Sequence, residues 1–448
     1  MHELVMASAL QLARRIRERE VSALEVVQAH LEHIATVNPR VNALVQITAE
    51  PALAAARAAD AALARGEASG PWHGVPFTVK DVVEVEGVIS AAGLPARADF
   101  RPAADAVVAA RMRAAGAILL GKTNCPPGGG GGWTDNPVYG PTNNPYQLAY
   151  SPGGSSGGEA AAVAAGMSPL GIGSDSGGSI RLPAHFCGIA GLKPTHGRIP
   201  NTGVLNHPGG LFSDPRTQIG PLARSVEDLY TALDTLRGVD DHDSGVIPMP
   251  LAGLDDAPLG RLRVAFYTDD GQATPTQETQ QAIAASAETC AHAGMRVSER
   301  RPEAIRDART ITERYWEMER LSGAQIARLF EEWDGFRSCM LAFMRDYDII
   351  LCPVDHRPAG PHPRRPLTRD AEREDISTFL GAADPLRFNY TLPFSLCGYP
   401  CVVVRVGTSA EGLPIGAQVI AQPWREERAL AVALVLERAF GGWQPPLL

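Results

Sequence analysis

The sequence predicts an α/β fold in which a large, mixed β-sheet is covered by helices on both faces. Helical patterns alternate along most of the chain with short apolar segments of strand length, which is typical of parallel or mixed sheets joined by helices. The 448 residues, 45% of them hydrophobic and 20% charged, have the composition of a large globular protein. Neither an internal repeat nor a low-complexity tail interrupts this pattern.

Two capping boxes, at residues 8–11 and 22–25, mark the first two helices. The second helix is expected over residues 22–37, with Asn38 and Pro39 ending it. Later helices follow from alanine-rich or amphipathic periodicity, and strands follow from short apolar runs. In chain order these elements are strand 41–47, helix 51–65, strand 75–79, helix 107–115, strand 117–120, helix 159–167, strand 170–173, strand 262–267, helix 276–294, a largely helical stretch 305–347, strand 348–353, strands 401–406 and 415–421, and helix 425–440.

Two segments are expected to be irregular. Residues 239–260 are rich in Asp, Pro and Gly and predict a linker or surface loop. Residues 357–373 are rich in proline and charge and predict a loop that covers an opening.

Charge and cysteine usage exclude several classes of protein. A formal net charge of −9 with scattered Lys and Arg argues against a nucleic-acid partner. The seven cysteines are widely spread without a C-x-x-C pair, so neither disulfides nor a zinc site is expected and a reducing compartment fits. The chain starts without the pattern of a signal peptide, and no apolar run approaches the ~18 residues of a membrane span. We expect a soluble, cytoplasmic protein.

The run from Ser151 to Pro194 is the most informative stretch, because glycines frame two of its serines, Ser155 and Ser179. Glycine allows backbone angles closed to other residues and lets a substrate approach main-chain N–H groups. Gly177-Gly178-Ser179 therefore predicts a nucleophile whose neighbouring amides bind an oxyanion.

A nucleophilic serine needs a base. Three histidines, His185, His196 and His207, suggest a Ser-His-Asp triad, and Gly153–Gly157 matches the G-x-S-x-G pattern. A nucleophile elbow requires a strand leading into it, however, and residues 148–152 make a poor one.

The run and its companion motifs resemble the amidase signature family of serine hydrolases. The companions, in order, are T-V-K-D at Thr78–Asp81, G-K-T-N at Gly121–Asn124, Y-G-P-T-N-N-P at Tyr139–Pro145, G-L-K-P-T-H-G-R at Gly191–Arg198, G-P-L-A-R-S at Gly220–Ser225 and G-L-P-I-G-A-Q at Gly412–Gln418. The resemblance implies the amidase signature fold as a single domain over residues 1–448. Its core would comprise residues 1–238 and 386–448, including the signature region 151–194, with residues 239–385 as the variable substrate-side part.

The resemblance also assigns catalytic roles and sets the histidine triad aside. It makes Ser179 the nucleophile, Ser155 the bridging serine after a cis peptide bond from Gly154, and Lys80 the base. Lys80 must be neutral to accept a proton, and the apolar segment 75–79 before it is consistent with burial that lowers its pKa.

The expected supporting groups surround these three residues. Backbone N–H groups of Ser176, Gly177, Gly178 and Ser179 would bind the oxyanion, and Ser156 would serve as a supporting hydroxyl.

Two charged residues flank the nucleophile. Arg181 would either bind a substrate carboxylate or pair with Asp175 to stiffen the loop.

A glycine run within Cys125–Pro137 predicts substrate contacts from Gly131, Gly132, Trp133 and Thr134, as in similar amidases. The alternative is a surface turn with Trp133 packed in the core.

Residues 116–123 match the Walker A pattern G-x-x-x-x-G-K-[ST]. Their central residues form an expected strand and prolines follow closely, so we predict no nucleotide site.

The expected function is hydrolysis of a small aryl or alkyl carboxylic amide through an acyl-serine intermediate, with esterase side activity and without a metal or organic cofactor. A carbamate (urethane) hydrolase using the same triad is an alternative. A glutaminase-type component of an amidotransferase complex is another, although residues 132–135 depart from the G-S-S-T-E-N segment typical of those proteins. A catalytically silent binding protein is a third. The sequence leaves open whether helices after residue 239 form a homodimer interface.

Overall fold

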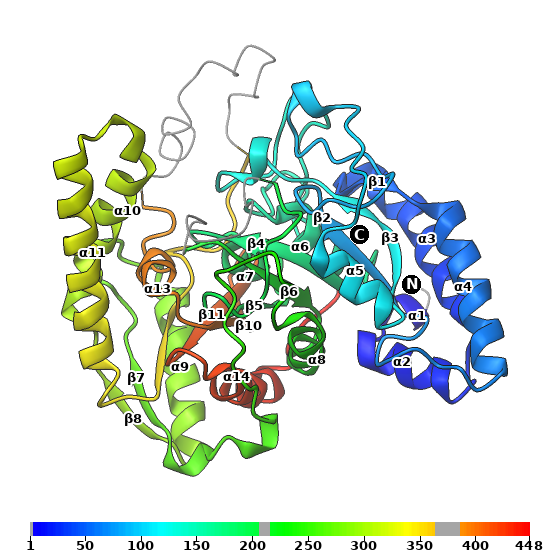
Figure 1. Cartoon of the computed structure of the whole chain (residues 1–448). Coiled ribbons are helices and arrows are strands. Elements are labelled where there is room, and N and C mark those ends of the chain that lie inside the picture. Colours follow the sequence, from blue (N-terminus) through cyan, green and yellow to red (C-terminus); the bar gives the residue numbers. More distant parts are fainter. Residues whose placement is uncertain (1–2, 206–215, 363–385) are drawn as a thin grey trace.

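The computed structural model describes residues 3–205, 216–362 and 386–448. In this part of the chain, eleven strands form one mixed sheet in the order β1-β3-β2-β4-β6-β5-β10-β11-β9-β7-β8, with helices around it (Figure 1). The strands are β1 Leu44–Ile47, β2 Pro76–Lys80, β3 Ile118–Thr123, β4 Leu170–Asp175, β5 Ala190–Lys193, β6 Gln218–Ala223, β7 Arg263–Phe266, β8 Arg296–Glu299, β9 Ile349–Pro353, β10 Cys401–Thr408 and β11 Pro414–Ala421. The predicted α/β class with a large mixed sheet is confirmed.

The α-helices of the described residues lie between and around these strands. They are α1 Glu3–Met6, α2 Ala9–Arg17, α3 Ala23–Val41, α4 Ala49–Ala64, α5 Val107–Ala114, α6 Gly157–Ala164, α7 Arg181–Phe186, α8 Val226–Leu236, α9 Gln277–His292, α10 Ala308–Trp316, α11 Gly323–Phe343, α13 Leu392–Cys397 and α14 Glu426–Phe440. None of them is long and apolar enough to cross a membrane.

Most predicted elements are present, and both capping boxes are confirmed at the starts of α2 and α3. One predicted end is wrong, because α3 continues past Pro39 to Val41. Asn42 ends this helix by adopting a left-handed backbone with φ +54°. Residues 239–260 contain only short 3₁₀ turns, as expected for a loop. Within the loop predicted at 357–373, residues 363–373 lie outside the described residues, and so does His207.

Alternation along the strands explains how the sheet is covered on both faces. In β10, Val402 and Val404 pack in one core cluster with Leu430 of α14. The residue between them, Val403, packs in a different cluster with Ala184 of α7. Helices α14 and α7 therefore cover opposite faces of the central strands.

The two ends of the sheet carry different helices. α1–α4 gather on the side of the molecule that holds β1 and β3, and α10 and α11 stand on the side that holds β7 and β8 (Figure 1). The strands β7, β8 and β9 come from the region expected to be variable, yet they extend the same sheet through the pairing of β9 with β11.

The sheet topology brings the chemically interesting residues to one edge. Strands β2 and β4 are parallel neighbours, so their carboxyl ends lie side by side. Lys80 is the last residue of β2, and Asp175 is the last residue of β4. Helix α6 starts at Gly157, which places Ser155 and Ser156 just before its first turn.

A buried ion pair at the end of the motif G-L-K-P-T-H-G-R joins this core to the last helix. The Arg198 and Glu426 side chains are 1% and 0% exposed, and their charged atoms are 2.7 Å apart. We expect Arg198→Met to lower the free energy of unfolding by about 3–5 kcal/mol, because it leaves a buried carboxylate without its partner. Urea unfolding measures this difference.

The matched control is Arg14→Met, which removes an exposed pair with Glu18. We expect it to leave the free energy of unfolding nearly unchanged, because water screens both exposed charges. Equal decreases in the free energy of unfolding of Arg198→Met and Arg14→Met would contradict a structural role for the buried pair.

Candidate active site

A cavity of about 230 Å³ lies at the carboxyl edge of β2 and β4. Glycines, hydroxyl side chains and apolar side chains line it together with one arginine. The lining residues are Val82, Gly128, Gly129, Gly130, Gly131, Ser155, Ser174, Ser176, Gly177, Ser179, Val204, Leu205, Arg216, Thr217, Trp316 and Phe388. The two predicted catalytic serines, Ser155 and Ser179, therefore face the same space.

Lys80 lies directly behind this cavity. Its side chain is fully buried, and its Nζ donates to Ser155 Oγ at 2.6 Å and to Ser174 Oγ at 2.8 Å. The lysine is thus connected to the cavity through two hydroxyl groups that line it. Such a chain of hydrogen bonds can carry a proton between the cavity and the amine.

Burial changes the acid–base behaviour of Lys80. Loss of solvation lowers its pKa to about 8, although the charges of Cys125, Asp175 and Glu159 act in the opposite direction. Because the shift brings the pKa close to neutral pH, an appreciable fraction of the amine is neutral under mild conditions. A neutral amine can accept a proton, which an ordinary surface lysine cannot do at this pH.

The segment around Ser155 is held tightly against the nucleophile loop. The peptide bond between Gly154 and Ser155 is cis, as the resemblance implies. The Ser156 backbone N–H donates to the Ser179 carbonyl at 3.1 Å, and the Ser156 hydroxyl donates to the Ser174 carbonyl at 3.1 Å. Ser156 therefore ties the bridging segment to both β4 and the loop of Ser179, which fits a supporting hydroxyl.

The loop after β4 turns around the carboxylate of Asp175. Gly178 N–H donates to its Oδ1 at 2.8 Å, and Ile180 N–H donates to its Oδ2 at 3.1 Å. The N–H of Gly178 is therefore engaged by the protein, unlike the expectation that all four amides of this loop face an oxyanion. In the described residues, the N–H groups of Ser176, Gly177 and Ser179 have no protein partner.

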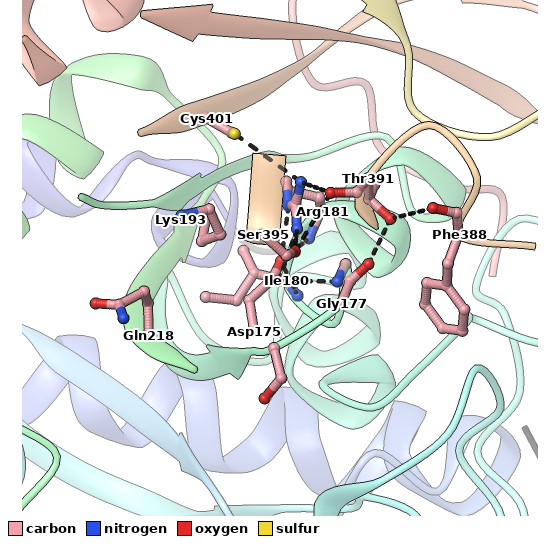
Figure 2. Close-up of polar contacts among 12 residues, drawn as sticks. Asp175, Gly177, Ile180, Arg181, Lys193, Gln218, Phe388, Thr391, Ser395 and Cys401 are labelled. Carbon is pink, nitrogen blue, oxygen red and sulfur yellow. Dashed lines mark hydrogen bonds and ion pairs between the residues drawn. The ribbon is translucent and has the colours of Figure 1, made fainter. Parts of the chain in front are cut away.

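Arg181 is a structural anchor in this geometry. Its guanidinium is fully buried, pairs with Asp175 at 2.9 Å and donates to Ser395 Oγ at 2.6 Å (Figure 2). It also donates to Gln418 Oε1 at 2.8 Å. Burial raises the pKa of the Asp175 carboxyl, but Arg181 outweighs it and the net pKa is below the ordinary value. The arrangement favours the stiffening alternative over binding of a substrate carboxylate.

The glycine-rich segment divides between the cavity and the core. Gly131 lines the cavity, together with the three glycines before it. Trp133 is only 6% exposed, and the guanidinium of Arg387 lies 4.5 Å from its ring centre. Thr134 donates to the Gly153 carbonyl at 2.9 Å and accepts from Gly157 N–H at 3.1 Å. Gly132, Trp133 and Thr134 are absent from the lining, so the packed alternative for Trp133 is favoured.

The Walker-like segment is not a phosphate loop. Six of its residues form β3, and Lys122 is fully buried with its Nζ 3.1 Å from Asp81 Oδ1. Without a helix starting at this lysine, no row of free amides can face a phosphate.

Several residues at the site were missed by sequence reasoning. Ser174 lies within the glycine-serine run, so its hydroxyl could have been proposed as a second contact for Lys80. Arg216, Trp316 and Phe388 line the cavity from positions far along the chain, where no motif marks them. Only the folded sheet brings these side chains to the signature run.

Comparison with known proteins places this geometry in a family. The amidase family model matches residues 25–322 and 307–430, which together span most of the chain. The chain belongs to the amidase family. The resemblance to amidase signature enzymes is thereby confirmed, and the protein is a hydrolase of carbon–nitrogen bonds other than peptide bonds.

Its relatives within the amidases act on different compounds. The chain is 35% identical to the indoleacetamide hydrolase of Bradyrhizobium diazoefficiens, over 97% of this chain and 86% of the relative. It is 34% identical to a glutamyl-tRNA(Gln) amidotransferase component of Roseiflexus castenholzii, over 98% and 96% of the two chains. The solved structure of 6-aminohexanoate cyclic dimer hydrolase is 31% identical, covers 100% of this chain and 99% of its own, and superimposes with a TM-score of 0.88.

Cysteine reactivity tests the burial of the site. Cys125 lies fully buried next to Lys80, and burial raises the pKa of its thiol to about 12, whereas Cys339 is exposed. We expect Ellman's reagent to titrate one thiol in the native amidase and all seven after denaturation. Cys339→Ser should abolish the native signal, and rapid modification of Cys125 would contradict the closed site.

Proposed function

We propose that this amidase hydrolyses small carboxylic amides through an acyl-serine intermediate on Ser179, with Ser155 and Lys80 as its proton relay. The observation that carries the proposal is the 2.6 Å hydrogen bond from buried Lys80 Nζ to Ser155 Oγ, in a cavity that Ser179 also lines. A buried amine with a lowered pKa and a bridging hydroxyl is the combination that activates a serine without histidine.

In the proposed acylation step, neutral Lys80 takes a proton from Ser155 while Ser155 takes the proton of Ser179. Ser179 Oγ forms a bond to the amide carbonyl carbon, and the carbonyl oxygen becomes an oxyanion. The free N–H groups of the loop, led by Gly177 and Ser179, stabilise that charge where it develops. This stabilisation needs no reorganisation, since the loop is already fixed by Asp175.

The intermediate then collapses and the carbon–nitrogen bond breaks. The proton held by Lys80 returns through Ser155 to the leaving nitrogen, which departs as a neutral amine. Water next attacks the acyl-serine by the same relay and releases the carboxylic acid. The enzyme ends in its starting protonation state.

The cavity supports a small, partly apolar substrate. Val82, Leu205, Trp316 and Phe388 supply apolar and aromatic surface, while hydroxyls and backbone amides gather near the serines. We infer aryl or alkyl amides as the main class, and the likeness to an indoleacetamide hydrolase agrees with an aromatic acyl group. Reactive esters and carbamates are chemically close and would use the same relay.

A glutaminase-type role within an amidotransferase complex is the second candidate, favoured by the 34% identity to the Roseiflexus castenholzii protein. The departure at residues 132–135 from the typical segment of those proteins weighs against it. Glutamine hydrolysis that rises on adding partner proteins of the complex would identify this role, whereas a stand-alone amidase turns over small amides alone.

The first test compares wild type with Ser179→Ala on primary amides, anilides, aryl carbamates and glutamine. We expect amine release from at least one small amide to fall by about 10³-fold or more in the variant, because the nucleophile is lost. Ser168→Ala is the control: it removes a buried serine hydroxyl that donates to the Leu170 carbonyl away from the cavity. Full activity in Ser179→Ala would refute the proposed nucleophile.

The pH dependence tests the role of Lys80. Below its pKa of about 8 the lysine is protonated and cannot accept a proton, so kcat/KM should rise about tenfold per pH unit and level off above pH 8. Lys80→Met should lose the activity at every pH.

The pH profile needs a control for Glu159, since burial raises the pKa of its carboxyl to about 8, the same value as for Lys80. If kcat/KM still rises with pH in Glu159→Gln, the titrating group is Lys80 and not Glu159. A profile that is flat between pH 6 and 9, or a rise that vanishes in Glu159→Gln, would contradict the assignment.

A further inference from the structure

One peptide unit of the nucleophile loop is held at both ends by groups outside the cavity. Its carbonyl, that of Gly177, accepts a short hydrogen bond from Thr391 Oγ1 (Figure 2). Its N–H, that of Gly178, donates to Asp175 Oδ1 at 2.8 Å. The orientation of this peptide fixes the two amides on either side of it, those of Gly177 and Ser179.

The two holding groups are themselves linked through Arg181. The guanidinium pairs with Asp175 at 2.9 Å, and its Nη1 donates to the backbone carbonyl of Thr391 at 2.9 Å. Asp175, Arg181, Thr391 and the peptide between Gly177 and Gly178 thus form a closed ring of hydrogen bonds. Every member of the ring apart from Gly177 lies outside the cavity lining.

The peptide needs this support because glycine stands on both sides of it. Gly178 has φ +141°, a conformation that side chains rarely allow, and a Cβ there would come within 2.5 Å of Thr391 Oγ1. Glycine backbones rotate at little steric cost. Without the Thr391 hydroxyl the Gly177 carbonyl can turn toward the cavity, and the amides of Gly177 and Ser179 turn with it.

We propose that Thr391 is a positioning residue for the oxyanion-binding amides and acts through the Gly177 carbonyl. It lies 214 residues beyond Gly177 in the chain, at the start of α13, and is fully buried. This proposal rests on the proposed serine mechanism. It adds that part of the oxyanion site is set by a hydroxyl that never touches the substrate.

The test compares Thr391→Val, which keeps the shape and loses the donor, with Thr391→Ser, which keeps the donor. On the best amide substrate we expect kcat to fall about 10- to 100-fold in Thr391→Val, with KM changed less than about threefold, because the amides act in the transition state. Thr391→Ser should recover most of kcat. Inhibition by phenylboronic acid, whose serine adduct is tetrahedral, should weaken by the same factor as kcat/KM.

Controls separate this effect from general damage. Thr312→Val removes a buried hydroxyl that bonds along its own helix to the Ala308 carbonyl, and should leave kcat and KM unchanged. Circular dichroism gives the folded fraction that normalises each rate. If Thr391→Val does not fold, the same comparison is made between Thr391→Ser and Thr391→Ala.

The outcomes distinguish the two proposals. An inactive Ser179→Ala beside a fully active Thr391→Val would overturn the role of Thr391 and leave the serine mechanism standing. Equal losses in Thr391→Ser and Thr391→Val would also overturn it, because the hydroxyl would then not matter. An active Ser179→Ala would refute the mechanism itself.

Discussion

Burial of the Lys80 amine is the constraint on which the site depends. The described residues place no carboxylate within ion-pair distance of this amine, and its hydrogen bonds go to two neutral hydroxyls. An unpaired ammonium inside a protein is costly, so the lysine loses its proton more easily than it would in water. The sheet contributes to this environment, since β2 lies between β3 and β4 and also contacts α6.

The neighbouring strand β3 carries a second buried lysine, Lys122, which has a different kind of partner. Lys122 of β3 is just as buried, but it forms an ion pair with Asp81 and hydrogen bonds to the Asp81 carbonyl and the Ser90 hydroxyl. Lys122 is thus held in an ion pair, whereas both hydrogen bonds of the Lys80 amine go to hydroxyl groups. Burial lowers the pKa of both amines, so the difference between the two lysines lies in their partners, a carboxylate for Lys122 and hydroxyls for Lys80.

The fold was largely predictable because long helices and apolar strands carry their own periodic signal. The short elements β5, β6, β8, α7 and α13 were missed, since a few residues show no period and depend on contacts with distant segments. Helix α8 was also missed, although its 11 residues follow a serine N-cap that could have indicated it. The grouping of Ser155, Ser179 and Lys80 followed from motifs, whereas Ser174 and Thr391 needed the folded sheet. The burial of Trp133 could not be predicted from sequence, because its ring packs against residues such as Arg387, more than 250 positions away.

Two kinds of residue contribute to the cavity wall. One kind is glycine, such as Gly177 of the nucleophile loop, whose peptide with Gly178 is held in place by the hydrogen-bonded ring of Asp175, Arg181 and Thr391. A Cβ at Gly178 would come within 2.5 Å of the Thr391 hydroxyl. Two large side chains, Trp316 at the end of α10 and Phe388 before α13, also line the cavity. Phe388 is coupled to the ring, because its carbonyl accepts from the Thr391 hydroxyl at 3.1 Å and a Cβ at Gly178 would come within 2.9 Å of its aromatic ring. Under the proposed mechanism, substitutions of Trp316 would alter which acyl group fits, while those at Gly178 would alter how well the oxyanion is held.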